Sequence, residues 1–313
     1  MTDPLLILAG TVLLYFGGDR LIHHAWHVAR GLGMSPLVVG LTVVAFATSS
    51  PELAASLAAA LTGTPEVAFG NVVGSNIANL GLILGITAIV RPLVGSARFL
   101  RRELPFLLAA SVGAVAIVLD GRIGRIEATI LLVAIGLYVW WLLREPPTEA
   151  KRVEKEFSDE YGEAPKRLWV DVVGIVIAVG LLVVGARMLV HGAVELARDA
   201  GISERVIGLT GVALGTSLPE LAGSVAAVLK READIALGNL VGSNVFNLLL
   251  ILGTTALVRP LAVERAGALV DLAVMLGFTV VIWPFLWSRL RIGRIEGSVL
   301  LLGYAVYLAA LFA

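Results

Sequence analysis

Two glutamates stand in matching surroundings in the two halves of the chain. Glu52 lies in ATSSPELAAS (47–56) and Glu220 in GTSLPELAGS (215–224), and each is flanked by apolar and small residues inside a long apolar run. A carboxylate at the centre of a bilayer costs roughly 2.5 kcal/mol or more, so an intramembrane acid is a functional candidate by default. Both glutamates are therefore candidate ligands for a cation.

A proline precedes each glutamate, at Pro51 and Pro219. Proline removes a helical hydrogen bond and frees carbonyl groups about one turn upstream. The freed carbonyls belong to Ala47, Thr48, Gly215 and Thr216. Irregular backbone is tolerated within a membrane where it lines a cavity or an ion path. The pattern predicts a broken helix that presents carbonyls, hydroxyls and a carboxylate together.

A second pair of matching stretches adds polar side chains. The stretches are GNVVGSNIANLGLILG (70–85) and GNLVGSNVFNLLLILG (238–253). A serine and an asparagine four residues apart share one helical face in each stretch. These two pairs are Ser75 with Asn79 and Ser243 with Asn247. For the remaining asparagines, interhelical hydrogen bonding and ligation fit equally well: Asn71, Asn76, Asn239 and Asn244.

The ligands offered by these motifs are all oxygens, namely carboxylates, hydroxyls, amides and backbone carbonyls. Oxygen ligands suit hard cations such as Ca²⁺, whereas Zn²⁺ and Cu²⁺ favour imidazole and thiolate. The formal charge of −2 from two glutamates matches one Ca²⁺ or two Na⁺. We therefore expect a hard cation such as Ca²⁺ or Na⁺ as the ligand, and no cofactor.

The composition sets the environment in which such a site must be built. Hydrophobic residues make up 58% of the 313 residues and charged residues 15%, and the mean hydropathy is +0.91. Soluble domains are typically about 45–50% apolar and about 25% charged. Lys and Arg together number 24, as do Asp and Glu, so no basic field indicates nucleic acid. The chain is predicted to be an integral membrane protein whose surroundings are the lipid bilayer.

Ten segments are long and apolar enough for membrane helices, which need about 20 residues. They are 4–29, 36–62, 66–90, 103–119, 126–143, 168–197, 204–229, 234–258, 268–287 and 296–313. Their apolar residues run continuously and do not alternate as in the strands of a membrane barrel. The predicted fold class is an all-α bundle of ten transmembrane helices.

The segments fall into an internal repeat. Residues 33–92 match residues 201–260 at 36 of 60 positions, and RIGRIE (122–127) returns at 291–296. We predict a first five-helix repeat over 1–143, a linker over 144–167 and a second repeat over 168–313. An odd number of helices turns the second repeat upside down, and inverted repeats are typical of secondary transporters with a central site.

Charge bias predicts the orientation. With the N-terminus outside, the inner loops hold 16 Lys and Arg residues and the outer loops hold 6. Cytoplasmic loops carry the excess of positive charge. We therefore expect a multi-pass protein of the cell membrane with both termini outside and the 144–167 linker in the cytoplasm.

The paired motifs, (G/A)TSxPE and GNxxGSNxxN, resemble the α-repeats of the cation/calcium exchanger superfamily, and most closely those of prokaryotic sodium/calcium antiporters. The resemblance implies four cation subsites enclosed by the second, third, seventh and eighth helices, with the first and sixth helices switching access. It implies that Glu52 and Glu220 bind Ca²⁺ together with the carbonyls of Thr48 and Thr216. It also implies flanking Na⁺ sites formed by the hydroxyls of Ser49, Ser75, Ser217 and Ser243 and the carbonyls of Ala45 and Ala213.

Asn79 and Asn247 depart from part of this superfamily. Several relatives, including potassium-dependent exchangers, have Asp at one of these positions, so the resemblance implies a potassium-independent protein. Asn also occurs here in calcium/proton exchangers. Position 79 and position 247 therefore leave both Na⁺ and H⁺ open as the coupling ion, whereas both alternatives transport Ca²⁺.

The favoured function is an antiporter that exchanges Na⁺ for Ca²⁺, and a Ca²⁺/H⁺ antiporter is the alternative. A channel is disfavoured because inverted repeats with broken helices favour alternating access. An enzyme is disfavoured because no histidine lies near either glutamate and the serines lack a base. His23, His24 and His27 could bind metal, but interfacial anchoring is the favoured interpretation.

Overall fold

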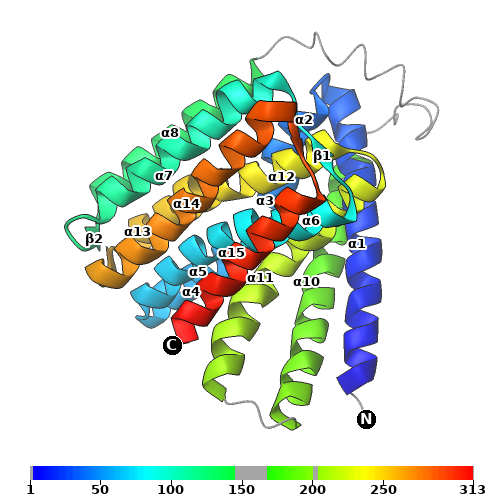
Figure 1. Cartoon of the computed structure of the whole chain (residues 1–313). Coiled ribbons are helices and arrows are strands. Elements are labelled where there is room, and N and C mark those ends of the chain that lie inside the picture. Colours follow the sequence, from blue (N-terminus) through cyan, green and yellow to red (C-terminus); the bar gives the residue numbers. More distant parts are fainter. Residues whose placement is uncertain (1–2, 145–167, 200–203, 313) are drawn as a thin grey trace. The chain divides into compact units, whose positions relative to one another are not determined.

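The computed structural model describes residues 3–144, 168–199 and 204–312, and its elements are almost entirely helical (Figure 1). Within these ranges seven helices are long and apolar enough to cross a membrane, or eight if the bent pair Pro36–Thr48 and Ser50–Thr62 forms one span. All ten segments expected from the sequence are helical. The predicted all-helical membrane class is confirmed.

The chain forms two compact units, and each contains segments from both halves of the sequence. Unit 1 comprises Met1–Thr48 and Trp141–Asn239, and unit 2 comprises Ser49–Trp140 and Leu240–Ala313. The bounds of the compact units therefore differ from those of the predicted sequence repeats, which follow the internal duplication of the chain. The expected 144–167 linker lies, apart from Arg144, outside the described residues.

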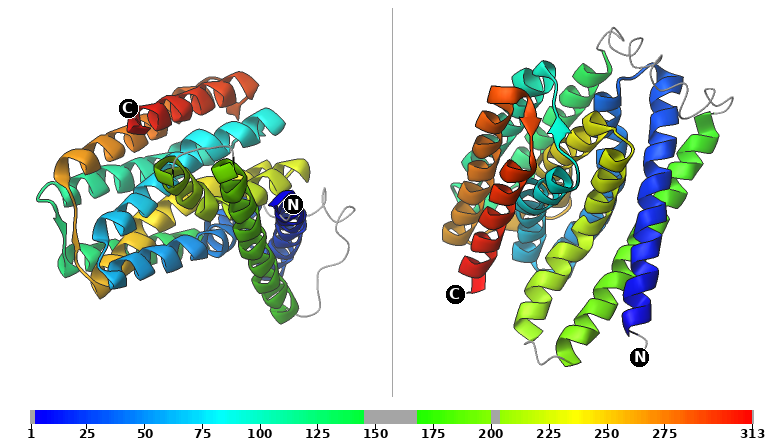
Figure 2. Two further views of the ribbon diagram at one scale, coloured as in Figure 1. Left: turned by 90° about the horizontal axis from the view of Figure 1, so that it is seen from below. Right: turned by 45° about the vertical axis from the view of Figure 1, so that its right-hand side comes forward.

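Unit 1 is built on two long helices that lie side by side (Figure 2). Its elements are α1 (Asp3–Leu32), α2 (Pro36–Val39), the π-helix η1 (Gly40–Val44), α3 (Ala45–Thr48), α10 (Leu168–Asp199), α11 (Glu204–Leu229) and the start of α12 (Ala233–Phe246). A Cβ added to Gly10 of α1 would lie 2.6 Å from the carbonyl oxygen of Gly185 in α10. Such small residues let helix backbones approach closely in a membrane.

Unit 2 holds the remaining helices and four two-residue strands. Its elements are α4 (Ser50–Thr62), α5 (Pro65–Ala78), η2 (Asn79–Ile83), α6 (Leu84–Val90), β1 (Leu93–Val94), η3 (Phe99–Glu103), α7 (Leu104–Val118), β2 (Arg122–Ile123), most of α8 (Arg125–Leu143), the end of α12, η4 (Asn247–Ile251), α13 (Leu252–Val258), β3 (Leu261–Ala262), α14 (Arg265–Arg289), β4 (Arg291–Ile292) and α15 (Arg294–Phe312). Helix α14 packs on α7, and α15 packs on α6.

The strands of unit 2 pair between repeats in a reciprocal way. Leu93 of β1 pairs with Ile292 of β4, and Leu261 of β3 pairs with Ile123 of β2. Exchanging each residue for its repeat equivalent converts one pair into the other. This relationship is that of a two-fold axis, in which each side offers the same contacts to the other.

The strands also show that the repeats run in opposite directions. Strand β1 precedes η3 and α7, and β2 follows them, so the two ladders lie at opposite ends of α7 (Figure 1). Strand β3, the repeat equivalent of β1, pairs with β2 and so lies at the far end. The repeats in unit 2 are therefore inverted, as the odd number of helices predicts.

The helix is interrupted near Pro51 but not near Pro219. The helix before Pro51 ends at Thr48 and resumes at Ser50 with a bend of 43°. In contrast, α11 continues through Pro219, so the expectation of a second break was wrong. Membrane helices tolerate proline when neighbouring groups satisfy the freed backbone.

Candidate cation-binding site

Glu52 lies in the first turn of α4, and its side chain is fully buried. The backbone carbonyl of Glu52 accepts a hydrogen bond of 3.2 Å from Nδ2 of Asn71 in α5. The same amide nitrogen donates to Oγ of Ser56 at 2.9 Å. Asn71 therefore fixes the turn that carries the carboxylate to the neighbouring helix.

Glu220 has the same support in the second repeat, and it too is fully buried. Nδ2 of Asn239 in α12 donates to the Glu220 carbonyl at 3.4 Å and to Oγ of Ser224 at 2.9 Å. The donor and acceptors are 19 and 15 residues apart in both repeats. The duplication thus preserves the three-residue arrangement that positions each acid. Asn71 and Asn239 thus make the interhelical hydrogen bonds that one of the two interpretations of the sequence predicted.

Thr48 joins this arrangement in unit 1. Its hydroxyl donates to Oδ1 of Asn239 at 3.1 Å and lies 3.4 Å from the carbonyl oxygen of Ala45. Helix α3, which ends at Thr48, packs against α11, which carries Glu220. Unit 1 therefore brings a residue of the first repeat to the acid of the second.

Asn79 and Asn247 each begin a π-helix, η2 and η4 respectively. π-Helical turns inside α-helices occur frequently at functional sites. Both side chains are fully buried, and neither amide has a hydrogen-bond partner among the described residues. The buried hydroxyl of Ser75 likewise lacks a partner in this part of the chain. A buried polar group without a partner costs about 1–3 kcal/mol, so these oxygens are well suited to bind an ion.

Unit 2 also combines the two repeats. Both α4, which carries Glu52, and α5, which carries Ser75, pack against η4, whose first residue is Asn247. Glu52 of the first repeat therefore lies on a helix that packs against η4 of the second repeat, where the amide of Asn247 has no hydrogen-bond partner among the described residues. Each unit therefore contains candidate oxygen ligands from both halves of the chain.

The structure distributes the expected site residues between the units. Unit 2 holds Ser49, Glu52, Ser75, Asn79, Ser243 and Asn247. Unit 1 holds Ala45, Thr48, Ala213, Thr216, Ser217 and Glu220. The hydroxyls of Thr216 and Ser217 have no hydrogen-bond partner in the described chain. Ala213 lies in the part of α11 whose side chains are outside the description.

Several polar residues that matter here were not singled out from the sequence. Ser56 and Ser224 accept the asparagine amides, and they end the two matching motifs, four residues after each glutamate. Tyr138 donates to Oε2 of Glu103 at 2.8 Å. Their repeat equivalents, Tyr307 and Asp271, form the same bond at 2.9 Å. The recurrence of an acid and a tyrosine at the repeat offset could have revealed this pair.

These features together define a class of protein. Duplicated, fully buried acids with unsatisfied hydroxyl and amide oxygens, in an inverted-repeat helical membrane fold, define a cation transporter rather than an enzyme. Comparison with known proteins gives the family. The chain belongs to the sodium/calcium exchanger protein family, whose model matches residues 2–144 and 170–313.

Individual relatives align along nearly their whole length. The putative antiporter CaxA of Alkalimonas amylolytica is 37% identical, with 100% of this chain and 99% of CaxA covered. The sodium/calcium exchanger MaX1 of Methanosarcina acetivorans is 34% identical, with 98% of each chain covered. A solved structure of the sodium-calcium exchanger NCX_Mj superimposes with a TM-score of 0.83 at 30% identity, covering 99% of this chain and 98% of that one. The predicted resemblance is confirmed.

Proposed function

We propose that this exchanger is a secondary active antiporter that exchanges Na⁺ for Ca²⁺ across the membrane by alternating access. The observation that carries the proposal is the pair of matching asparagine-supported glutamates, together with the buried oxygens of Ser75, Asn79 and Asn247. A donor set made of oxygens favours these hard cations. Two relatives described above carry the name sodium/calcium exchanger.

In this proposal Glu52 and Glu220 supply the charge for Ca²⁺, and the carbonyls of Thr48 and Thr216 complete its ligands. The hydroxyls of Ser49, Ser75, Ser217 and Ser243 and the carbonyls of Ala45 and Ala213 bind Na⁺. The amides of Asn79 and Asn247 provide neutral oxygens beside these ions. Because Na⁺ and Ca²⁺ need the same carboxylates, each ion lowers the affinity for the other by the same factor.

Exchange of Ca²⁺ for H⁺ is the second candidate. The specific observation in its favour is that positions 79 and 247 both hold amides, which leaves Glu52 and Glu220 as the acids of the paired motifs. Two protons would neutralise these two carboxylates as completely as one Ca²⁺ does. The two candidates therefore differ in the driving ion and share the Ca²⁺ ligands.

Ca²⁺ uptake into proteoliposomes distinguishes the candidates. Vesicles are loaded with Na⁺ or held at an imposed pH difference, with the membrane potential set by valinomycin and K⁺. We expect uptake to follow the Na⁺ gradient at constant pH. If three Na⁺ move for one Ca²⁺, one net charge moves per cycle, equivalent to about 2.3 kcal/mol per 100 mV.

The controls give each candidate a distinct result. Uptake that follows the pH difference and ignores the Na⁺ gradient would establish the proton exchanger. Uptake that requires neither gradient and shows no saturation would indicate a channel. Empty vesicles and the Glu52→Gln variant give the background leak.

We also propose the orientation that the charge bias predicts, with both termini outside and the 144–167 linker in the cytoplasm of a cell-membrane protein. The excess of Lys and Arg in the loops on the linker side supports this orientation.

A further inference from the structure

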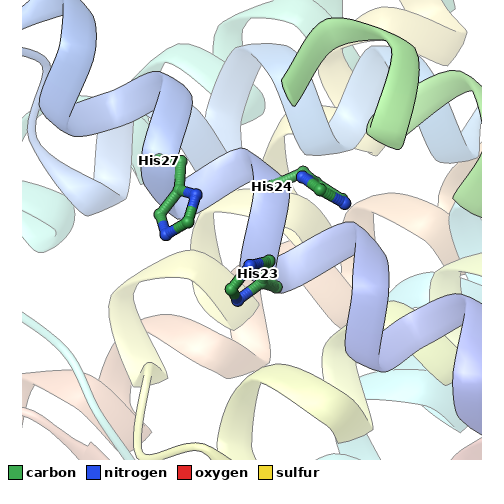
Figure 3. A group of neighbouring side chains, drawn as sticks. All are labelled: His23, His24 and His27. Carbon is green, nitrogen blue, oxygen red and sulfur yellow. The ribbon is translucent and has the colours of Figure 1, made fainter. Parts of the chain in front are cut away.

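Three of the chain's four histidines gather on one part of α1 (Figure 3). His23, His24 and His27 each offer a ring nitrogen, and these three nitrogens lie within 4.8 Å of one another. The ring centroids of His23 lie 4.3 Å from His27 and 5.1 Å from His24. Residues of one helical turn thus bring three imidazole nitrogens close together.

A buried carboxylate on the neighbouring helix orients two of these rings. Oδ1 of Asp171, in the first turn of α10, lies 3.0 Å from Nδ1 of His24 and 3.1 Å from Nδ1 of His27. Asp171 is 2% exposed. Both Nδ1 atoms therefore face the same carboxylate oxygen, and a cation at this point would replace the protons through which they are bonded to Oδ1.

Imidazole nitrogens together with a carboxylate oxygen form a ligand set that Zn²⁺ and related divalent metal ions use in proteins. Because Oδ1 of Asp171 already lies beside Nδ1 of both His24 and His27, this carboxylate is placed to be a fourth ligand.

Access and charge also suit a cation. The side chains of His24 and His27 are 19% and 12% exposed, so neither ring is fully enclosed by the described part of the protein. The nearby ammonium of Lys230 is paired with Asp19 at 2.7 Å, which offsets its repulsion. Closing the rings onto an ion at about 2.0–2.1 Å per nitrogen requires modest side-chain rotation.

We propose that His23, His24 and His27 form a binding site for a divalent transition-metal ion such as Zn²⁺, Ni²⁺ or Co²⁺. Asp171, which contacts Nδ1 of both His24 and His27 across the α1–α10 contact, supplies a fourth ligand. Imidazole nitrogens select this class of ion, whereas the oxygen ligands proposed around Glu52 and Glu220 select hard cations. All four ligand residues lie within unit 1.

Direct metal binding tests the proposal without relying on transport. Purified protein with its affinity tag removed is titrated with Co²⁺ in Na⁺- and Ca²⁺-free buffer, and binding is followed by calorimetry and by the visible absorption of Co²⁺. The chain has no cysteine, so thiolate cannot contribute to the spectrum. We expect one equivalent of Co²⁺ with a spectrum typical of imidazole ligands, and retention of that ion when excess Ca²⁺ is added.

Variants assign the ligands. His23→Gln, His27→Gln and Asp171→Asn should each lower the affinity for Co²⁺ at least tenfold, because each change removes or weakens one ligand. His191→Gln is the matched control, because His191 is the fourth histidine, is exposed, and lies on α10 outside the cluster. It should bind Co²⁺ like the wild type. Size-exclusion profiles establish that each variant is folded.

Three results would overturn the proposal. One is unchanged Co²⁺ affinity in both His23→Gln and His27→Gln, and another is equal loss in His191→Gln. The third is displacement of Co²⁺ by Ca²⁺, which would assign the bound ion to the oxygen ligands.

Discussion

The hydroxyl of Thr48 donates a hydrogen bond of 3.1 Å to Oδ1 of Asn239, and it thereby joins the two repeats within unit 1. Asn239 in turn holds the backbone of Glu220. The Thr48 hydroxyl therefore connects the end of α3, in the first repeat, to the turn that carries Glu220 in the second.

Removing the Thr48 hydroxyl should weaken this link. We expect Thr48→Val to lower the free energy of unfolding by about 0.5–1.5 kcal/mol, because Asn239 then loses one buried partner. The Thr48 carbonyl is unchanged, so Ca²⁺ transport should be reduced but not abolished. Thermal unfolding in detergent and Ca²⁺ flux measure the two effects. Thr48→Ser keeps the hydroxyl and should resemble the wild type; equal behaviour of the Val and Ser variants would contradict this role.

Neutralising either acid should abolish Ca²⁺ transport. Glu52→Gln and Glu220→Gln each remove half of the formal charge proposed for the Ca²⁺ ligands, and a divalent ion at low dielectric depends strongly on that charge. The amide has nearly the same shape, so the protein should still insert and fold. Ca²⁺ flux in proteoliposomes measures the loss. Glu66→Gln, at an exposed acid in the first turn of α5, is the control. Flux near the wild-type level in either site variant would refute the assignment.

Asn79 permits a test that separates ligation from packing. Its buried amide has no hydrogen-bond partner among the described residues, so Asn79→Leu should raise the free energy of unfolding by about 1–3 kcal/mol. The same change should lower Ca²⁺ transport, because an oxygen ligand is lost. Asn247→Leu should behave alike. An asparagine that serves folding alone would give the opposite pattern, with lower stability and unchanged flux in well-folded protein.

Removing the tyrosine hydroxyl from the two acid–tyrosine hydrogen bonds should lower the free energy of unfolding by unequal amounts. Tyr138→Phe leaves Glu103, which is fully buried, without this donor, and hydrogen bonds to charged groups contribute about 1.5–3 kcal/mol. Tyr307→Phe should cost less because Asp271 is only partly buried. Thermal unfolding of the two variants in the same detergent gives the comparison. A larger loss for Tyr307→Phe would show that burial does not control the strength of these bonds.

Orientation can be measured with single cysteines, since the chain contains none. Thr148→Cys in the linker should react with an impermeant reagent only from the cytoplasmic face, and Arg122→Cys in β2 only from outside. Arg122 is preferable to its neighbour Gly121, whose φ of +77° makes substitution unfavourable. The reverse labelling would overturn the charge argument and leave the repeat intact.

Much of this architecture follows from local properties of the sequence. Apolar length predicts the membrane helices, and the repeat predicts that whatever supports Glu52 also supports Glu220. The pairing of Asn71 with Ser56 follows less directly, because i,i+4 spacing identifies Ser56 as a neighbour of Glu52 but not its partner on another helix. Intramembrane polarity therefore locates the acids, and the structure supplies their contacts.

Other features depend on packing that no local pattern determines. Proline lowers the cost of breaking a helix at both Pro51 and Pro219, yet of these two helices only the first is interrupted. The surroundings of each proline decide the outcome. His24 and Asp171 are 147 residues apart in the sequence, so their contact could not be read from spacing. The sequence accordingly favoured an anchoring role for a cluster that the structure brings onto a buried carboxylate.

The exchanged strand pairs described above also constrain how the protein is made. Strand β1 ends at residue 94 but pairs with residues 291 and 292, so its edge stays open until nearly the whole chain has left the ribosome. Contacts of such long sequence separation form slowly and leave incomplete chains exposed to misassembly. The first repeat alone should therefore be a substrate for membrane quality control. Two halves synthesised as separate polypeptides should restore each other by completing both ladders.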